Sequence, residues 1–359
     1  MILNSVAIFF CSFFSLFLFR KFAHIINLVD TPSERKNHRG SVPLVGGLSI
    51  FVVVFSYLYV FPDTISSPYL YLLCAGTLLL VGVLDDYMDM SFKIRLLIQI
   101  SISIIMMAFA GLVLIELGQI LGPFSLNIGL IGYVATIITV VGAINAFNMV
   151  DGIDGLLGGL SVVTFASLGA LFYINGQFSQ ASFCLVIIAA TLPYILLNLG
   201  LPFGQRFKVF MGDAGSTVIG FTVVWLLIYG SQGEIKAIRP VTALWIAALP
   251  IIDAVSTIMR RIKKGHSPFK PDREHLHHIL QRLGIGSKGT LAVICFIAAV
   301  LAVIGVLSEM YKVSEYLMFF LFLLVFYIYY SIICRIWRIT VKLRRFFGIT
   351  KKKYQKSSC

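Results

Sequence analysis

Residues 289–307 read GTLAVICFIAAVLAVIGVL, an apolar run without a charged side chain. Because an α-helix rises about 1.5 Å per residue, a run of this length matches the roughly 30 Å hydrocarbon core of a bilayer. Ten further apolar runs occur along the chain, at 2–19, 43–61, 68–84, 94–115, 128–147, 156–175, 181–199, 214–230, 240–259 and 315–334. The sequence therefore predicts an all-α polytopic membrane protein with about 11 transmembrane helices.

The composition excludes the main soluble classes. Of the 359 residues, 58% are hydrophobic and 13% are charged, against roughly 25% charged in soluble domains. The mean hydropathy is +0.93. A soluble globule could not bury that much apolar surface, and a disordered chain would have the opposite composition. The apolar runs are also continuous, whereas a transmembrane β-barrel shows alternating segments.

Basic residues are distributed unevenly among the loops. If the N-terminus lies outside, all 29 lysines and arginines fall in inner segments except Lys236, Arg239 and Lys312. Basic loops stay in the cytoplasm, so we expect a periplasmic N-terminus and a cytoplasmic C-terminus. The tail at 335–359 then suits anionic lipid headgroups, and the net charge of +13 needs no nucleic acid to explain it. A small periplasmic hairpin is predicted near 117–127.

Acidic, amide and histidine side chains gather at the inner ends of the predicted spans. Carboxylates without partners at membrane depth cost about 2.5–3.5 kcal/mol each, so a counter-charge is needed, and a divalent cation is the simplest one. The polar positions concerned are Asp85 and Asp86; Asn145, Asn148, Asp151 and Asp154; Asp213; and Arg273, His275, His277 and His278.

The second of these groups has a regular spacing. Residues 145–156 read NAFNMVDGIDGL, with a polar side chain at every third position from Asn145 to Asp154. On a continuous helix these side chains would share half a turn of surface, and the two glycines would let the backbone approach a ligand. A polar seam between helices is the alternative explanation.

Residues 211–215 read MGDAG and open a predicted span. The free amides of a helix N-terminus, together with two glycines, predict a corner that binds anions. Asp213 would then hold Mg²⁺ while the amides hold phosphate. The alternative is that Asp213 only caps the helix.

Residues 272–278 read DREHLHH, within the largest inner loop at 260–288. Three histidines in four positions suggest zinc, but the carboxylates elsewhere are hard oxygen ligands that prefer Mg²⁺ or Mn²⁺. With Arg273 present, a clamp for phosphate is favoured over a solvated basic loop. For a second basic loop, at 29–47, contact with phosphate and a generic basic flank both remain open.

The order of these motifs resembles that of the polyprenyl-phosphate N-acetylhexosamine-1-phosphate transferases. The resemblance runs from about residue 20 to about residue 290 and includes PLVGG at 43–47. The form DREHLHH is similar to the branch of the family that acts on undecaprenyl phosphate and UDP-GlcNAc. The branch of peptidoglycan synthesis instead has a His-His-His-Phe-Glu run, which this sequence lacks.

The resemblance implies a reaction and a cellular place. UDP-N-acetylhexosamine, most simply UDP-GlcNAc, and undecaprenyl phosphate would give undecaprenyl-diphospho-sugar and UMP, with Mg²⁺ or Mn²⁺ as cofactor. This step would start a lipid-linked glycan such as O-antigen. It also implies a multi-pass protein of the bacterial inner membrane, with a cytoplasmic active site and a homodimeric assembly. Residues 1–334 would form one transmembrane catalytic domain, and 335–359 a basic cytoplasmic tail.

Site roles follow from the motifs and the resemblance together. Asp213 and Asn148 are the expected metal ligands. The expected catalytic residues are Asp85, Asp86, Asp213, His277 and His278, and the expected substrate-binding residues are Lys93, Asn145, Asp151, Asp154, Arg273 and His275. Asp253, inside a predicted span, receives no role in the site.

Two alternatives stay open. The same reaction with another UDP-N-acetyl sugar (GalNAc, FucNAc or QuiNAc) would need only a different sugar-binding loop. A secondary transporter is the alternative outside the enzymes, because charged residues inside spans are common there. Against it, Asp253 is the single acidic residue placed inside a predicted span.

Overall fold

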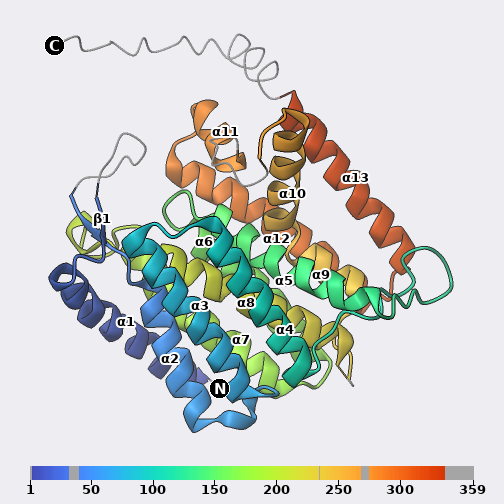
Figure 1. Cartoon of the computed structure of the whole chain (residues 1–359), viewed down its shortest axis with the longest axis horizontal. Coiled ribbons are helices and arrows are strands. Elements are labelled where there is room, and N and C mark those ends of the chain that lie inside the picture. Colours follow the sequence, from blue (N-terminus) through green and yellow to red (C-terminus); the bar gives the residue numbers. More distant parts are fainter. Residues whose placement is uncertain (1, 32–39, 234, 268–274, 336–359) are drawn as a thin grey trace.

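The structure is a computed structural model of the chain, and it describes residues 2–31, 40–233, 235–267 and 275–335. Helices dominate it (Figure 1). Their order is α1 (Ile2–Ile25), α2 (Gly46–Val60), α3 (Pro68–Met88), α4 (Phe92–Ala110), α5 (Ile131–Met149), α6 (Leu156–Ile174), α7 (Phe178–Asn198), α8 (Gly212–Gln232), α9 (Pro240–Ile246), α10 (Ala248–Lys263), α11 (Leu276–Arg282), α12 (Ser287–Met310) and α13 (Glu315–Cys334). Two short 3₁₀ turns, η1 (Pro62–Thr64) and η2 (Gln205–Phe207), lie between them.

The predicted class is confirmed: the chain is a helical, multi-pass membrane protein. Within the described residues, 9 helices are long and apolar enough to cross a membrane. The run predicted at 43–61 forms the shorter α2, with 15 residues. The run predicted at 94–115 ends early, because Gly111 adopts a φ of +67° and stops α4.

The run at 240–259 was predicted as one span, and in the structure it is not a continuous helix. It forms α9 and α10, which meet at an angle of 82°. Pro250 in the first turn of α10 explains the break, because it has no N–H to donate to the carbonyl of Ile246 and its ring would clash with that carbonyl. Both α9 and α10 contact α13.

Helix α8 forms the centre of the bundle. It packs against α2, α3 and α5, and nearly all of its residues are buried. In its middle the hydroxyls of Thr222 and Tyr71 are hydrogen-bonded at 2.8 Å, and the ring of Trp225 meets that of Tyr71 edge to face. The first turn of α8, which carries Asp213, is therefore fixed by its neighbours.

Glycines bring the neighbouring backbones close to that first turn. A Cβ atom on Gly82 of α3 would lie 2.3 Å from the Cα of Ala214, and one on Gly47 of α2 would lie 2.2 Å from the Cα of Gly215. Small residues at helix contacts allow this approach within membranes. The glycines of the segment 43–47 thus serve helix packing.

The same packing gives a stability prediction. Gly82→Ala is expected to lower the melting temperature of the purified protein by about 5 °C, because an overpacked contact costs ~1–3 kcal/mol. Gly142→Ala is the control, since a Cβ atom there meets nothing within 4 Å. Both changes raise helix propensity alike. Equal melting temperatures for the two variants would contradict the close contact between α3 and α8.

Backbone pairing also positions the start of α8. Strand β1 (Val29–Asp30) pairs antiparallel with β2 (Val42–Pro43). The segment after β2 continues beside the residues that precede α8: Phe210 N–H donates to Pro43 at 2.8 Å, and Gly46 N–H donates to Phe210 at 2.9 Å. The described part of the loop 29–47 therefore supports the turn that leads into Asp213.

The predicted hairpin near 117–127 is present. Glu116 and Asn127 form an antiparallel bridge, and Leu117 N–H donates to Leu126 O at 2.9 Å. Gln232 at the C-terminal end of α8 holds this hairpin by accepting from Glu116 N–H at 3.0 Å. The hairpin thus lies at the opposite end of α8 from Asp213. The basic tail beyond residue 335 lies outside the described residues.

Candidate active site

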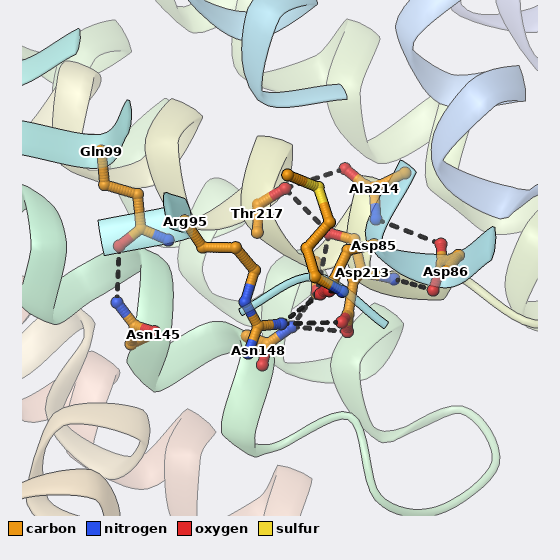
Figure 2. Close-up of polar contacts among 11 residues, drawn as sticks. Asp85, Asp86, Arg95, Gln99, Asn145, Asn148, Asp213, Ala214 and Thr217 are labelled. Carbon is orange, nitrogen blue, oxygen red and sulfur yellow. Dashed lines mark hydrogen bonds and ion pairs between the residues drawn. The ribbon is translucent and has the colours of Figure 1, made fainter. Parts of the chain in front are cut away.

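A small cleft opens where α3 and α5 end and α8 begins. The empty space in it, open solvent included, is about 370 Å³. Its polar walls come from four helices, as Figure 2 shows. The lining side chains are Asp85, Arg95, Gln99, Asn145, Asn148, Asp213 and Thr217, over a floor of Leu78, Val81 and Gly82. The structure therefore brings Asp85, Asn145, Asn148 and Asp213 together, as the sequence predicted.

Arg95 of α4 joins two carboxylates in this cleft. Its Nη1 atom is paired with Asp85 and lies 3.2 Å from Oδ2 of Asp213 (Figure 2). The Asp85 side chain is 3% exposed and that of Asp213 is 39% exposed. Asp85 also accepts a hydrogen bond from Met90 N–H at 2.8 Å. Asp213 is thus the carboxylate that water and substrate can reach, and Asp85 lies behind it.

Two amides complete the wall on the α5 side. Asn148 Nδ2 donates to Oδ1 of Asp213 at 2.8 Å and to the hydroxyl of Ser216 at 2.9 Å. Asn145, one turn earlier, donates to Oε1 of Gln99 at 2.8 Å. The predicted pair of metal ligands, Asp213 and Asn148, is therefore in direct contact.

Asp86 has a different place from Asp85. Its carboxylate accepts from the backbone N–H groups of Asp213 at 3.0 Å and Ala214 at 3.5 Å (Figure 2). Gly212 adopts a φ of +73°, and a Cβ atom there would lie 2.4 Å from Oδ2 of Asp86. The predicted phosphate corner at the start of α8 is therefore filled by a carboxylate of the chain itself. Asp86 satisfies the free amides of the helix and fixes Asp213.

The prediction that residues Asn145 to Asp154 share one helix face is wrong. Helix α5 ends at Met149, and Asp151 and Asp154 lie in the turn before α6. Gly155, with a φ of +77°, permits that turn. Asp154 forms an ion pair of 2.7 Å with Lys208. Burial first, and then the charges of Asp213 and Asp154, raise the pKa of Asp151 to about 7.

The histidine group lies against this turn. His277 is buried, and a Cβ atom on Gly152 would lie 2.2 Å from its Nε2 atom. Its ring centroid is 4.1 Å from that of His278 and 5.9 Å from that of His275. Burial first, then the neighbouring histidines, lower the pKa of His277 to about 3, so its ring is neutral at pH 7. Arg273 lies outside the described residues.

Comparison with known proteins gives the family. The family model described as glycosyl transferase family 4 matches residues 69–231. The chain is 49% identical over 285 residues to the undecaprenyl-phosphate alpha-N-acetylglucosaminyl 1-phosphate transferase of Haemophilus influenzae, covering 79% of this chain and 80% of that protein. This chain belongs to glycosyl transferase family 4.

Other members of the family with the same printed name match equally well. The protein of Yersinia pestis is 49% identical over 289 residues, which is 80% of this chain and 79% of its own. The protein of Escherichia coli (strain K12) is 49% identical over 284 residues, which is 79% of this chain and 77% of its own. The matched stretch of the family model contains the whole carboxylate and amide cleft.

Arg95, the basic side chain that lines the cleft, was not predicted from the sequence. Lys93 was predicted to bind substrate, yet it is exposed, and the cleft is lined by Arg95 instead. Arg95 and Gln99 are four residues apart on α4 and therefore share a face. A charged and a polar side chain at this spacing in an otherwise apolar helix was the signal that could have revealed them.

The donor set of the cleft fits magnesium better than zinc. Within the described ranges, no three His, Cys, Asp or Glu side chains are grouped so that they could hold a metal ion by themselves. Zinc sites need three or four such ligands. Magnesium is usually held by one or two carboxylates with water and substrate phosphates. Asp213, partly exposed and backed by Asn148, offers that kind of incomplete site.

Proposed function

We propose that this protein transfers GlcNAc-1-phosphate from UDP-GlcNAc to undecaprenyl phosphate and releases UMP. Three relatives that are 49% identical over about four fifths of the chain carry this activity in their printed names. The observation that carries the proposal on the structural side is the cleft in which Arg95, Asp213 and Asn148 meet.

The chemistry is a displacement at phosphorus. An oxygen of the lipid phosphate forms a bond to the β-phosphorus of the UDP-sugar, the bond from that phosphorus to the bridging oxygen breaks, and UMP leaves with this oxygen. The lipid phosphate is already an anion at neutral pH, so the reaction needs no strong base. The main barrier is the approach of two polyanions, which fixed positive charge relieves.

The residues of the cleft have different roles in this reaction. Arg95 supplies a fixed positive charge, and its two carboxylate partners hold its guanidinium in place. Asp213 and Asn148 would hold Mg²⁺ or Mn²⁺, which, when bound, neutralises phosphate charge. Asp85 and Asp86 fix Arg95 and the start of α8, so they act mainly by positioning. The turn with Asp151 and the histidines would face the nucleotide sugar.

We also propose where in the cell this protein acts. The uneven distribution of lysine and arginine supports an inner-membrane protein whose cleft opens to the cytoplasm. The water-soluble UDP-sugar would arrive from that side and the lipid phosphate from the bilayer. The product would start a lipid-linked glycan such as O-antigen. A homodimer and a basic cytoplasmic tail at 335–359 remain predictions from the resemblance and the sequence.

The test is an assay of UMP release. Purified full-length protein, undecaprenyl phosphate and Mg²⁺ are incubated with UDP-GlcNAc, UDP-GalNAc, UDP-FucNAc or UDP-QuiNAc. We expect release of UMP with UDP-GlcNAc above all. Preference for another sugar would assign the protein to a sister activity. Uptake of substrate by proteoliposomes without UMP release would instead support a transporter.

Metal removal gives a second prediction. Excess EDTA is expected to lower UMP release at least ~100-fold, because the phosphates lose the cation that neutralises their charge. Adding Mg²⁺ or Mn²⁺ in excess over EDTA should restore the rate, whereas Zn²⁺ should not, since the cleft offers oxygen ligands. Full activity in EDTA would overturn the assignment of a metal to Asp213 and Asn148.

A further inference from the structure

A buried carboxylate outside the cleft links three helices. Asp253 of α10 is 4% exposed. Its Oδ2 atom lies 2.8 Å from Nδ1 of His275, and its Oδ1 atom accepts from Leu276 N–H at 3.2 Å and from the hydroxyl of Tyr329 at 2.5 Å. A buried charge is stable only when it is paired and hydrogen-bonded in this way. From the sequence alone, Asp253 had no role in the site.

The partners of Asp253 define the start of α11. His275 directly precedes this helix, and Leu276 is its first residue. The carboxylate therefore accepts one of the free N–H groups at the helix N-terminus. Because a carboxylate only accepts hydrogen bonds, the proton of His275 must sit on Nδ1, which fixes the ring's orientation. Tyr329 of α13 holds the carboxylate from another side.

Contacts lead from this network to the cleft. The ring of His275 is stacked on that of His277, with an angle of 2° between the planes. His277 lies against Gly152, in the turn that follows α5. Four residues before Gly152, Asn148 contacts Asp213 at 2.8 Å. An unbroken set of packed groups therefore connects Asp253 with the turn beside the cleft.

We propose that Asp253 is a positioning residue for the binding of the nucleotide sugar, and this rests on the proposed function. It orients His275 and, through the stacked rings, sets His277 against the turn at Gly152. Helix α11 has seven residues and is not among the membrane-spanning helices. In the proposed function this turn, which also carries Asp151, faces the nucleotide sugar, so the substrate that Asp253 serves is the UDP-sugar and not the lipid.

The test compares two Michaelis constants in the full-length protein. Asp253→Asn keeps the size of the side chain but removes the charge and one acceptor. We expect the KM for UDP-GlcNAc to rise about tenfold, the effect of losing one hydrogen bond to a charged group. The KM for undecaprenyl phosphate should stay within about twofold, which a general loss of structure would not allow. Adding the change to His275→Ala should have no further effect, because the two residues act as one unit.

A matched pair of variants on α13 distinguishes the loss of a contact to Asp253 from misfolding. Tyr329→Phe deletes one hydrogen bond to Asp253 and should raise the KM for UDP-GlcNAc about threefold. Tyr327→Phe is the control, since Tyr327 is 65% exposed on the same helix. An unchanged KM for UDP-GlcNAc in the Asp253 and Tyr329 variants, equal rises in both constants, or additive effects with His275→Ala would overturn the proposal. If the wild-type protein releases no UMP with any UDP-sugar, the proposed function fails instead.

Discussion

Asp213→Asn is expected to lower the rate of UMP release about 1,000-fold, which corresponds to ~4 kcal/mol of lost transition-state stabilisation. Asp213 is the cleft carboxylate that stays partly exposed, and it contacts both Arg95 and Asn148. Asparagine keeps the size and one acceptor but loses the charge that would hold the metal. The fold should persist, because the backbone N–H of residue 213 still donates to Asp86.

The rate is measured as UMP release at saturating UDP-GlcNAc, with the melting temperature recorded beside it. Asp63→Asn is the control, since Asp63 is an exposed carboxylate in η1, outside the cleft. A rate for Asp213→Asn within about threefold of the wild type would refute the central place of this carboxylate.

Arg95→Met should have the second largest effect, a fall in kcat/KM of about 100-fold. The variant loses the fixed cation of the cleft and leaves Asp85, which is nearly buried, without its ion partner. Arg95→Lys should recover only part of the activity, because the lysine side chain is shorter and its ammonium group would not reach the position that Nη1 holds between the two carboxylates.

Lys93→Met separates the sequence prediction from the structure. The sequence assigned substrate contact to Lys93, whereas the structure places Arg95 in the cleft and leaves Lys93 exposed. We expect the Lys93 variant to keep its activity within about threefold. If Lys93→Met lowered the activity more than Arg95→Met, the active enzyme would use Lys93 and not Arg95 in the cleft.

Local sequence was sufficient to predict the membrane-spanning class and three residues of the site. In an apolar run as long as a bilayer is thick, a helix lets the backbone N–H and C=O groups form their hydrogen bonds within the segment. The fold class therefore follows from runs such as 289–307 without tertiary contacts. Asp85, Asn148 and Asp213 were also recognisable, because charged and strongly polar side chains at the ends of such runs are costly unless they serve a site.

Two of the assignments that failed depend on partners distant in the sequence, and a third on a local turn. Asp86 looked equivalent to Asp85, yet it binds amides that lie more than 120 residues away at the start of α8. The Gly212 corner looked like a phosphate site because its occupant could not be seen. Spacing suggested a continuous helix through Asp154, but α5 ends at Met149.

The sequence by itself determined that this protein is a helical membrane enzyme of its family, because hydropathy and motif order are properties of contiguous residues. Only the tertiary structure decided which basic side chain lines the cleft. It also decided that Asp86 accepts hydrogen bonds from amides at the start of α8 and that Asp253 is bonded to the histidine segment before α11. The physical reason is that a polar group's role depends on which donor or acceptor meets it. In this bundle those partners come from other helices, so the packing around α8 and α10 sets them.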